Sequence, residues 1–184
     1  MIELRDISVG FGEKRVLCGL EAIWPDSGTI LLRGASGSGK TTLLRVLAGL
    51  LAPDMGMVSG LTGRRIGMVF QEDRLLPWRT TLENVSLTSD RTTAKNLLER
   101  LDLGDALNLR PVVLSGGMRR RVALARALSY SDDVLLLDEP FNGLDAEHRA
   151  QAASLLQRCS RLRIVATHNV EDADLLNAVE TLHL

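Results

Sequence analysis

The sequence predicts an α/β fold in which a mostly parallel sheet is flanked by helices. One sign is a set of short apolar runs, rich in β-branched residues, with little alternation of apolar and polar positions, as in strands buried on both faces. The other is the helical pattern between these runs, because strand–helix alternation is typical of a parallel core. The runs are Thr29–Arg33, Ile66–Phe70, Val134–Asp138 and Arg163–Thr167. The helical patterns begin at Thr41, Thr92, Met118 and Ala146.

The N-terminal stretch has a different pattern. The segment IELRDISVGFGEKRVLCGLEAIW holds two alternating runs around Gly10 and Gly12. Such runs on either side of a glycine-containing turn predict a pair of antiparallel strands. We therefore expect an antiparallel β region before the parallel core.

The middle of the chain, residues 71–111, shows no clear strand and predicts loop and helix. We expect a single domain over residues 1–184, with a core formed by residues 1–71 and 112–184 and a small helical lobe inserted at about residues 72–111. The chain has no internal repeat, low-complexity tract or long linker, which argues against a multidomain array.

Composition narrows the classes of function. The chain has 184 residues, of which 45% are hydrophobic and 24% charged, enough for one compact core. The formal net charge of −1 gives no long-range attraction to nucleic acid, and we expect no nucleic-acid partner. Cys18 and Cys159 fit a reducing cytosol as small core residues. A signal peptide is not expected, and no apolar run reaches the length of a membrane-spanning helix.

A phosphate-binding loop follows the first apolar run. The segment GASGSGKTT matches the pattern G-x-x-x-x-G-K-[ST] between a strand and a helix, where such a loop works. Its glycines let backbone N–H groups surround the β-phosphate, Lys40 reaches the β- and γ-oxygens, and Thr41 offers a hydroxyl to Mg²⁺. The pattern indicates a P-loop NTPase core that binds nucleotide phosphates. The candidate binding residues are Gly34, Ala35, Ser36, Gly37, Ser38, Gly39, Lys40, Thr41 and Thr42.

Two carboxylates end a later strand. In VLLLDEP, Asp138 closes a buried run and is placed to hold the shell of a magnesium ion. Glu139 follows directly and is the candidate general base for an attacking water, a role typically worth about 10²–10⁴ in rate. The alternative is an ordinary Asp-Glu-Pro strand end.

A second anion-binding turn has no lysine. LSGGM, residues 114–118, places a serine and two glycines at a helix start, where free N–H groups and the helix dipole favour an anion. The alternative is a plain helix N-terminus with a solvated arginine face. Either way, a buried face is predicted from the spacing of four apolar residues, Met118, Val122, Ala125 and Leu128.

These three motifs in this order resemble the ATP-binding subunit of an ABC transporter, from Ile2 to about Leu182. The resemblance implies ATP and Mg²⁺ as cofactors, and two chains arranged head to tail around two ATP molecules. Ser115, Gly116 and Gly117 of one chain would then complete the phosphate site of the other. It also implies a peripheral position on the cytoplasmic face of the inner or plasma membrane.

The family pattern assigns further residues. Phe11 stands where an aromatic residue stacks on adenine, although a core phenylalanine is the alternative. Gln71 resembles the glutamine that contacts Mg²⁺ and the attacking water, and His168 resembles the histidine that contacts the γ-phosphate and orients that water. His148 and His183 have no such position and are expected at the surface.

Two segments imply protein contacts. Asp145 would reach the interface between the two chains, or else simply cap the helix that begins at Ala146. The loop Gln71–Trp78 would face a transmembrane permease, and VFQEDRLLPWRTTLENV resembles the matching segment in importers of nitrate and sulfonates. Its LLPW residues are then an exposed apolar patch with a partner, or they pack the lobe onto the core.

The function expected from these residues is ATP hydrolysis that drives solute transport through a separate membrane subunit. The alternatives are a soluble, non-transport ATPase of the same superfamily, an exporter-type ATP-binding subunit, and a nucleotide-gated binding module with negligible hydrolysis. The presence of Glu139 argues against the last of these.

Overall fold

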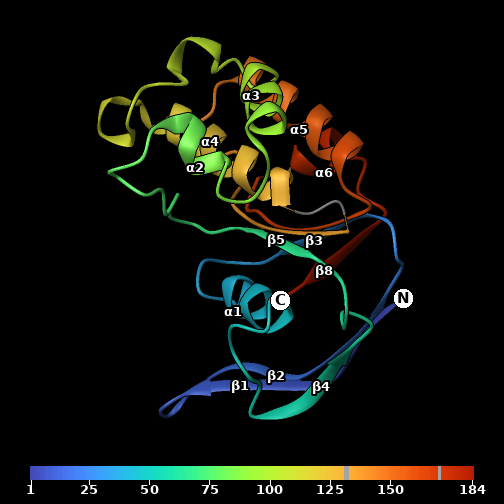
Figure 1. Cartoon of the computed structure of the whole chain (residues 1–184). Helices are drawn as coiled ribbons and strands as arrows, with labels where there is room; N and C mark the ends of the chain where they lie inside the picture. The colour runs from blue at the N-terminus through green and yellow to red at the C-terminus, as the bar shows by residue number, and fades with distance from the viewer. Residues whose placement is uncertain (131–132, 170) are drawn as a thin grey trace.

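A computed structural model describes residues 1–130, 133–169 and 171–184. It has two sheets, with α1 (Lys40–Leu47) between them and the other helices on one outer side (Figure 1). The strands in the described residues are β1 (Ile2–Phe11), β2 (Lys14–Trp24), β3 (Gly28–Arg33), β4 (Met55–Ser59), β5 (Ile66–Val69), β6 (Val134–Asp138), β7 (Leu162–Ala166) and β8 (Glu180–His183). The helices there are α1 (Lys40–Leu47), α2 (Thr81–Val85), α3 (Arg91–Glu99), α4 (Gly116–Tyr130), α5 (Ala146–Cys159) and α6 (Asp172–Leu175), with 3₁₀ turns at Gly104–Ala106 and Pro111–Val113.

The larger sheet has the strand order β5-β6-β7-β3-β8, and all of its paired strands are parallel. All four strands predicted for the parallel core are present in it. The fifth strand, β8, pairs with β3 over Ile30–Arg33 and was not predicted. Its sequence ETLH has no apolar run, so only its position beside β3 makes it a strand.

The smaller sheet confirms the predicted antiparallel pair and adds a strand. Its order is β2-β1-β4, and the pair β1–β2 turns at Gly12 and Glu13. β4 was missed because its residues are mostly exposed and include a glycine, which leaves no alternating pattern. Position 56 requires glycine because β1 lies very close to it. A Cβ on Gly56 would lie 2.2 Å from the carbonyl oxygen of Arg5.

Alternate residues of the parallel strands serve two hydrophobic cores, which explains why their sequences are apolar throughout. On one face, Ile30, Leu32 and Leu136 pack with α1 and the antiparallel sheet. On the other face, Leu31 and Leu137 pack with α2 to α5. Figure 1 shows α1 between the two sheets and the remaining helices beyond the parallel sheet.

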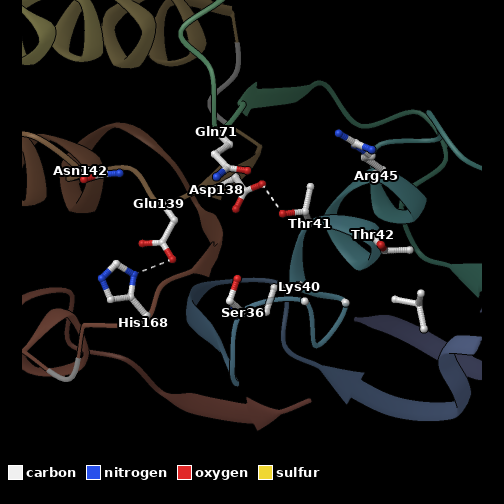
Figure 2. Close-up of a pocket in the computed structure, with 13 residues that line it drawn as sticks. Ser36, Lys40, Thr41, Thr42, Arg45, Gln71, Asp138, Glu139, Asn142 and His168 are labelled. Atoms are coloured by element: carbon white, nitrogen blue, oxygen red, sulfur yellow. Dashed lines mark hydrogen bonds and ion pairs between the residues drawn. The ribbon is translucent and has the colours of Figure 1, made fainter. Parts of the chain in front are cut away.

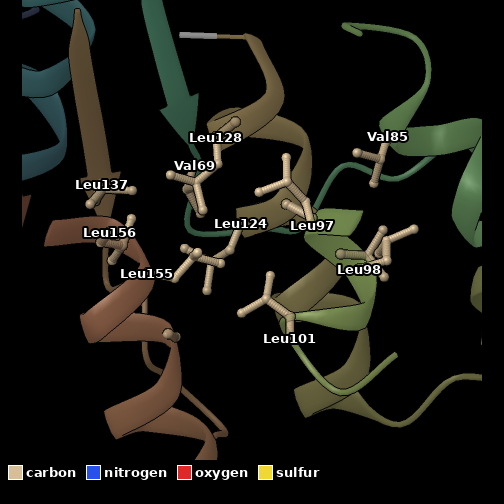
Figure 3. Close-up of a cluster of buried hydrophobic side chains, with 14 of the residues drawn as sticks. Val69, Val85, Leu97, Leu98, Leu101, Leu124, Leu128, Leu137, Leu155 and Leu156 are labelled. Atoms are coloured by element: carbon tan, nitrogen blue, oxygen red, sulfur yellow. The ribbon is translucent and has the colours of Figure 1, made fainter. Parts of the chain in front are cut away.

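The helices of residues 72–111 pack into the core that contains Leu31 and Leu137, which we call the second core. Val85 of α2 and Leu98 of α3 belong to the same buried cluster as Leu124 of α4 and Leu137 of β6 (Figure 3).

α4 begins at Gly116, two residues before the predicted start, because Ser115 caps it. The Ser115 Oγ accepts a 3.2 Å hydrogen bond from the Met118 N–H.

The burial of several side chains differs from the sequence-based expectation. Cys18 is exposed on β2 and is no core residue, while Cys159 is half-buried. Arg120 and Arg121 are buried, so the first turns of α4 carry no solvated arginine face. His148 is half-buried between Asp145 and Asp102, whereas His183 is exposed as expected.

Among the described residues, no helix is both long and apolar enough to cross a membrane.

Candidate functional site

A cavity of about 530 Å³ lies between the loop before α1 and the C-terminal ends of β6 and β7. Carboxyl ends of parallel strands, next to a helix N-terminus, are where α/β sheets bind ligands. Figure 2 shows the polar side chains that converge on this cavity from segments far apart in the chain. Among them are Lys40, Thr41, Gln71, Asp138, Glu139 and His168.

The phosphate-binding loop has the backbone that its glycines predict. Gly39 precedes α1 with φ at 104°, a conformation that favours glycine, and a Cβ there would lie 2.8 Å from Leu17 Cδ2. A Cβ on Gly34 would lie 2.5 Å from Ser38 Oγ. The loop is therefore tightly folded, and its Ser38 N–H donates a 3.2 Å hydrogen bond to the Ala35 carbonyl oxygen. A glycine-rich loop of this kind can direct its other N–H groups toward an anion.

Some residues of the phosphate-binding loop line the cavity, and others lie behind its wall. Ser36, Gly37, Gly39, Lys40, Thr41 and Thr42 line the cavity, and Gly34, Ala35 and Ser38 do not. Lys40 Nζ donates to the carbonyl oxygens of Gly34 and Ala35 over 2.8 and 2.9 Å, which holds the ammonium across the loop. Ser38 Oγ is buried and makes no hydrogen bond within the described residues.

Thr41 and Asp138 are joined at the cavity wall. Thr41 Oγ1 donates a 2.7 Å hydrogen bond to Oδ2 of Asp138, which ends β6. Gln71 lines the same cavity at the end of β5. The described residues hold no cluster of three or more His, Cys, Asp or Glu side chains that could hold a metal. The hydroxyl, carboxylate and amide oxygens here nevertheless suit Mg²⁺, which binds through few protein oxygens and keeps several waters.

Glu139 has an unusual backbone conformation. Its φ is +50°, in the left-handed region, which costs a residue other than glycine about 1–3 kcal/mol. Its N–H donates to the Ala166 carbonyl oxygen at the end of β7 over 2.8 Å. Its carboxylate, 18% exposed, lies 2.9 Å from Nδ1 of His168, which is 74% exposed. The backbone thus turns Glu139 out of the strand direction and toward His168 and the cavity.

Phe11 does not line the cavity. It is 53% exposed at the end of β1, so the alternative of a core phenylalanine is wrong. The residue of the β1–β2 hairpin that does line the cavity is the half-buried Val16. Val16 also lies against Gly39, since a Cβ on Gly39 would be 3.1 Å from Val16 Cγ1. Sequence reasoning had no signal for it, because a valine in a strand has no functional pattern of its own.

The second anion-binding turn lies apart from the cavity. Ser115 and Gly116 are exposed at the start of α4, and neither they nor Gly117 line the cavity. Asp145 lies outside it as well and caps α5, since its carboxylate accepts a 2.9 Å hydrogen bond from the His148 N–H. The sequence-based alternative for Asp145, a helix cap, is therefore what the single chain shows.

The loop after Gln71 both packs against the core and exposes an apolar side chain. Leu75 and Leu76 are half-buried, and Leu75 packs against the second core. Pro77 is exposed, and Trp78 is 65% exposed. The leucines thus anchor the loop, while the tryptophan ring faces outward.

Comparison with known proteins gives consistent matches. A family model described as ABC transporter matches residues 21–142. The aliphatic sulfonates import ATP-binding protein SsuB 1 of Agrobacterium fabrum is 40% identical over 181 residues, which cover 92% of this chain and 66% of that protein. The protein of the same name from Rhodococcus jostii is 48% identical over 154 residues, which cover 78% of this chain and 63% of that protein. The chain thus spans just under two thirds of the length of these two relatives.

Solved structures match over the whole chain. The dimeric post-hydrolysis state of the ATP-binding cassette MJ0796, bound to ADP and Pi, superposes with a TM-score of 0.90 at 27% identity and covers 100% of this chain and 94% of that one. A second dimeric structure of MJ0796, described as a bacterial ABC transporter cassette, gives a TM-score of 0.87 at 28% identity.

Proposed function

The chain belongs to the ABC transporter family, and we propose that it is the ATP-hydrolysing subunit that drives solute transport through a separate membrane protein. One observation carries the proposal: a phosphate-binding loop, a paired Thr41–Asp138 and a paired Glu139–His168 all meet at one cavity. That set binds a triphosphate at one end and presents a carboxylate base at the other.

In the proposed reaction, Lys40 and the loop N–H groups bind the β- and γ-phosphates of ATP. Glu139 accepts a proton from the attacking water, and His168 holds the Glu139 carboxylate toward the γ-phosphate. Phe11, exposed at the end of β1, would stack on the adenine ring.

Thr41, Asp138 and Gln71 are the residues that would hold Mg²⁺, because they supply three hard oxygen ligands on one cavity wall. A magnesium ion held by these residues would neutralise part of the negative charge on the phosphate oxygens. The chain's own contribution is to orient the Thr41 hydroxyl, which the bond to Asp138 already does.

We further propose that two copies bind two ATP molecules between them. Ser115 and Gly116 are exposed and lie outside the chain's own cavity, so a free anion-binding helix start is available to a second chain. The dimeric structures of MJ0796 support this arrangement. Asp145, at the exposed start of α5, would lie at the same interface.

The membrane partner is proposed to be an importer permease that contacts the Gln71–Trp78 loop. The exposed Trp78 offers an apolar contact on an anchored loop. The relatives named for aliphatic sulfonate import support a small anionic solute of that class. The chain would then act from the cytoplasmic face of the membrane, as a peripheral subunit.

A single variant tests the dimer and the chemistry together. Glu139→Gln keeps the shape of the side chain but removes the base, so we expect kcat for ATP to fall at least about 10²-fold. With ATP and Mg²⁺ this variant should elute as a dimer in sizing chromatography, and as a monomer without nucleotide. Glu147→Gln, a change on the exposed first turn of α5, is the matched control and should behave as the wild type. A Glu139→Gln chain that stays monomeric with ATP would contradict the two-ATP dimer.

A further inference from the structure

Arg120, in the second turn of α4, contacts the ends of two parallel strands at once. It is 3% exposed, and its guanidinium lies beyond the point where the β5–β6 ladder ends. It donates to five carbonyl oxygens, those of Phe70 (2.6 Å) and Gln71 (3.4 Å) on the β5 side, and those of Asp138, Glu139 (2.7 Å) and Pro140 (3.2 Å) on the β6 side.

These carbonyls have a physical need for a donor. Where two parallel strands separate, the ladder no longer supplies N–H partners, and buried carbonyl groups without a partner are destabilising. A guanidinium offers five N–H groups in a fixed plane, so it can satisfy both strand ends together, which a single ammonium cannot. Burial lowers the pKa of Arg120, and the nearby carboxylate of Asp73, 3.3 Å from Nη1, opposes that effect.

The contact fixes the backbone of Glu139 from both sides. The Glu139 N–H is held by the carbonyl of Ala166, and the Glu139 carbonyl accepts from Arg120. Its left-handed φ therefore persists against an intrinsic cost, because surrounding groups determine it. That same φ directs the carboxylate toward His168. The Glu139 carbonyl oxygen also accepts a 3.2 Å hydrogen bond from the Asn142 N–H in the turn that follows β6. In the described contacts, Arg120 is the residue that ties this carbonyl to α4.

We propose that Arg120 is a positioning residue for ATP hydrolysis, which holds Glu139 and Gln71 in their working geometry and ties both to the Ser115–Gly117 turn. This inference rests on the proposed function. Gly116 and Arg120 are one helical turn apart on α4. A shift of that turn against a second ATP would thus reach the backbone of the general base through a single side chain.

The test replaces the guanidinium by an ammonium. Arg120→Lys keeps the charge but reaches one strand end at most, so we expect kcat to fall about 10- to 100-fold while KM for ATP changes less than about threefold. Arg120→Gln, which loses the charge as well, should lower kcat further. ATP binding, measured by fluorescence with a nucleotide analogue, should stay within about threefold because Lys40 and its loop are untouched.

Arg163 provides the matched control. It is also buried, and its guanidinium donates to Thr29 Oγ1 (2.8 Å) and to the Ser160 carbonyl (2.6 Å) far from the cavity. Arg163→Lys should lower Tm about as much as Arg120→Lys does, with kcat within twofold of the wild type. A kcat within twofold of the wild type in Arg120→Lys, or an equal kcat loss in both lysine variants, would overturn the proposal.

A double variant shows whether Arg120 acts through Glu139. In a Glu139→Gln chain the base is already absent, so adding Arg120→Lys should lower the residual single-turnover rate by less than about twofold. A further tenfold loss would instead mean a general structural role and would overturn the proposal. If Arg120→Lys fails to bind ATP, a second variant, Asp73→Asn, tests the same side chain through its ion-pair partner. Asp73→Asn should lower kcat about two- to fivefold and leave ATP binding unchanged. An unchanged kcat in this variant would overturn the proposal.

The outcome separates this inference from the proposed function. A wild-type chain that hydrolyses no ATP, alone or reconstituted with membranes, contradicts the proposed function itself. A wild-type chain that is active, with Glu139→Gln inactive and Arg120→Lys fully active, contradicts only the role of Arg120.

Discussion

Nδ1 of His168 lies 2.9 Å from Oε1 of Glu139, although 29 positions separate the two residues in the chain. Glu139 follows β6 and His168 follows the neighbouring strand β7, so the parallel pairing of these strands brings the two side chains together. The pair stands at the cavity that also contains Lys40 and Thr41.

This pairing predicts the effect of removing the imidazole. His168→Ala should lower kcat for ATP about 10²-fold, because the carboxylate of Glu139 loses the group that orients it. Since His168 is largely exposed, Tm should change by no more than about 2 °C. Steady-state ATPase assays check this, with His183→Ala on β8 as an exposed-histidine control. Unchanged kcat in His168→Ala would remove the histidine from the reaction.

The Thr41 hydroxyl bonds to Asp138 and is proposed to bind Mg²⁺, so its removal should affect both stability and activity. Thr41→Val keeps the shape but removes the bond to Asp138, so unfolding free energy should fall by about 1 kcal/mol and Tm by about 2–4 °C. Mg²⁺-dependent kcat/KM should fall at least about tenfold. Thr93→Val is the control, because Thr93 Oγ1 donates a similar bond to Asp90 at the start of α3. Full ATPase activity in Thr41→Val would argue against its place in the metal site.

Asp145 predicts a pH effect on stability. Two hydrogen bonds from His148 hold the pKa of Asp145 below its ordinary value, and the bond from the His148 backbone N–H has a larger effect than the bond from its side chain. Its stabilisation is therefore complete above the unfolded-state pKa of about 3.9 and is lost as the pH falls through the lower folded-state pKa. Asp145→Asn keeps a good helix cap but cannot ionise, so between pH 4 and pH 2.5 its Tm should fall less than that of the wild type. Parallel Tm curves for the two chains would contradict this account.

The exposed ring of Trp78 predicts a loss of association without a loss of folding. Trp78→Ala should leave Tm unchanged, because the side chain is mostly in solvent. Affinity purification from membranes should recover a multi-span protein with the wild type and not with Trp78→Ala. Tyr130→Ala, at the exposed end of α4, is the aromatic control. Recovery of the membrane protein by Trp78→Ala would exclude this loop from the contact.

Much of the site could be predicted because its residues lie beside elements with strong local patterns. The phosphate-binding loop lies between β3 and α1, where its motif and the flanking patterns predicted it, and Asp138 and Glu139 end an apolar run that predicted β6. The antiparallel β1–β2 pair followed in the same way from alternation and a glycine turn.

Residues whose role depends on distant contacts escaped prediction. Arg120 looked like part of a charged helix surface, yet it is buried because two strand ends offer it five carbonyl groups. Val16 and β8 carry no pattern, and only the packing of neighbouring segments gives them a place at the site and in the sheet.

The sequence by itself determined the α/β class, the four core strands along the chain and the positions of the phosphate-binding loop and the two carboxylates beside them, because each depends on residues close together in the chain. The tertiary structure alone decided that Glu139 takes a left-handed backbone and turns toward His168. That conformation is unfavourable for an isolated glutamate. It exists here because β7 binds its N–H, while the Asn142 N–H and the Arg120 side chain of α4 bind its carbonyl oxygen.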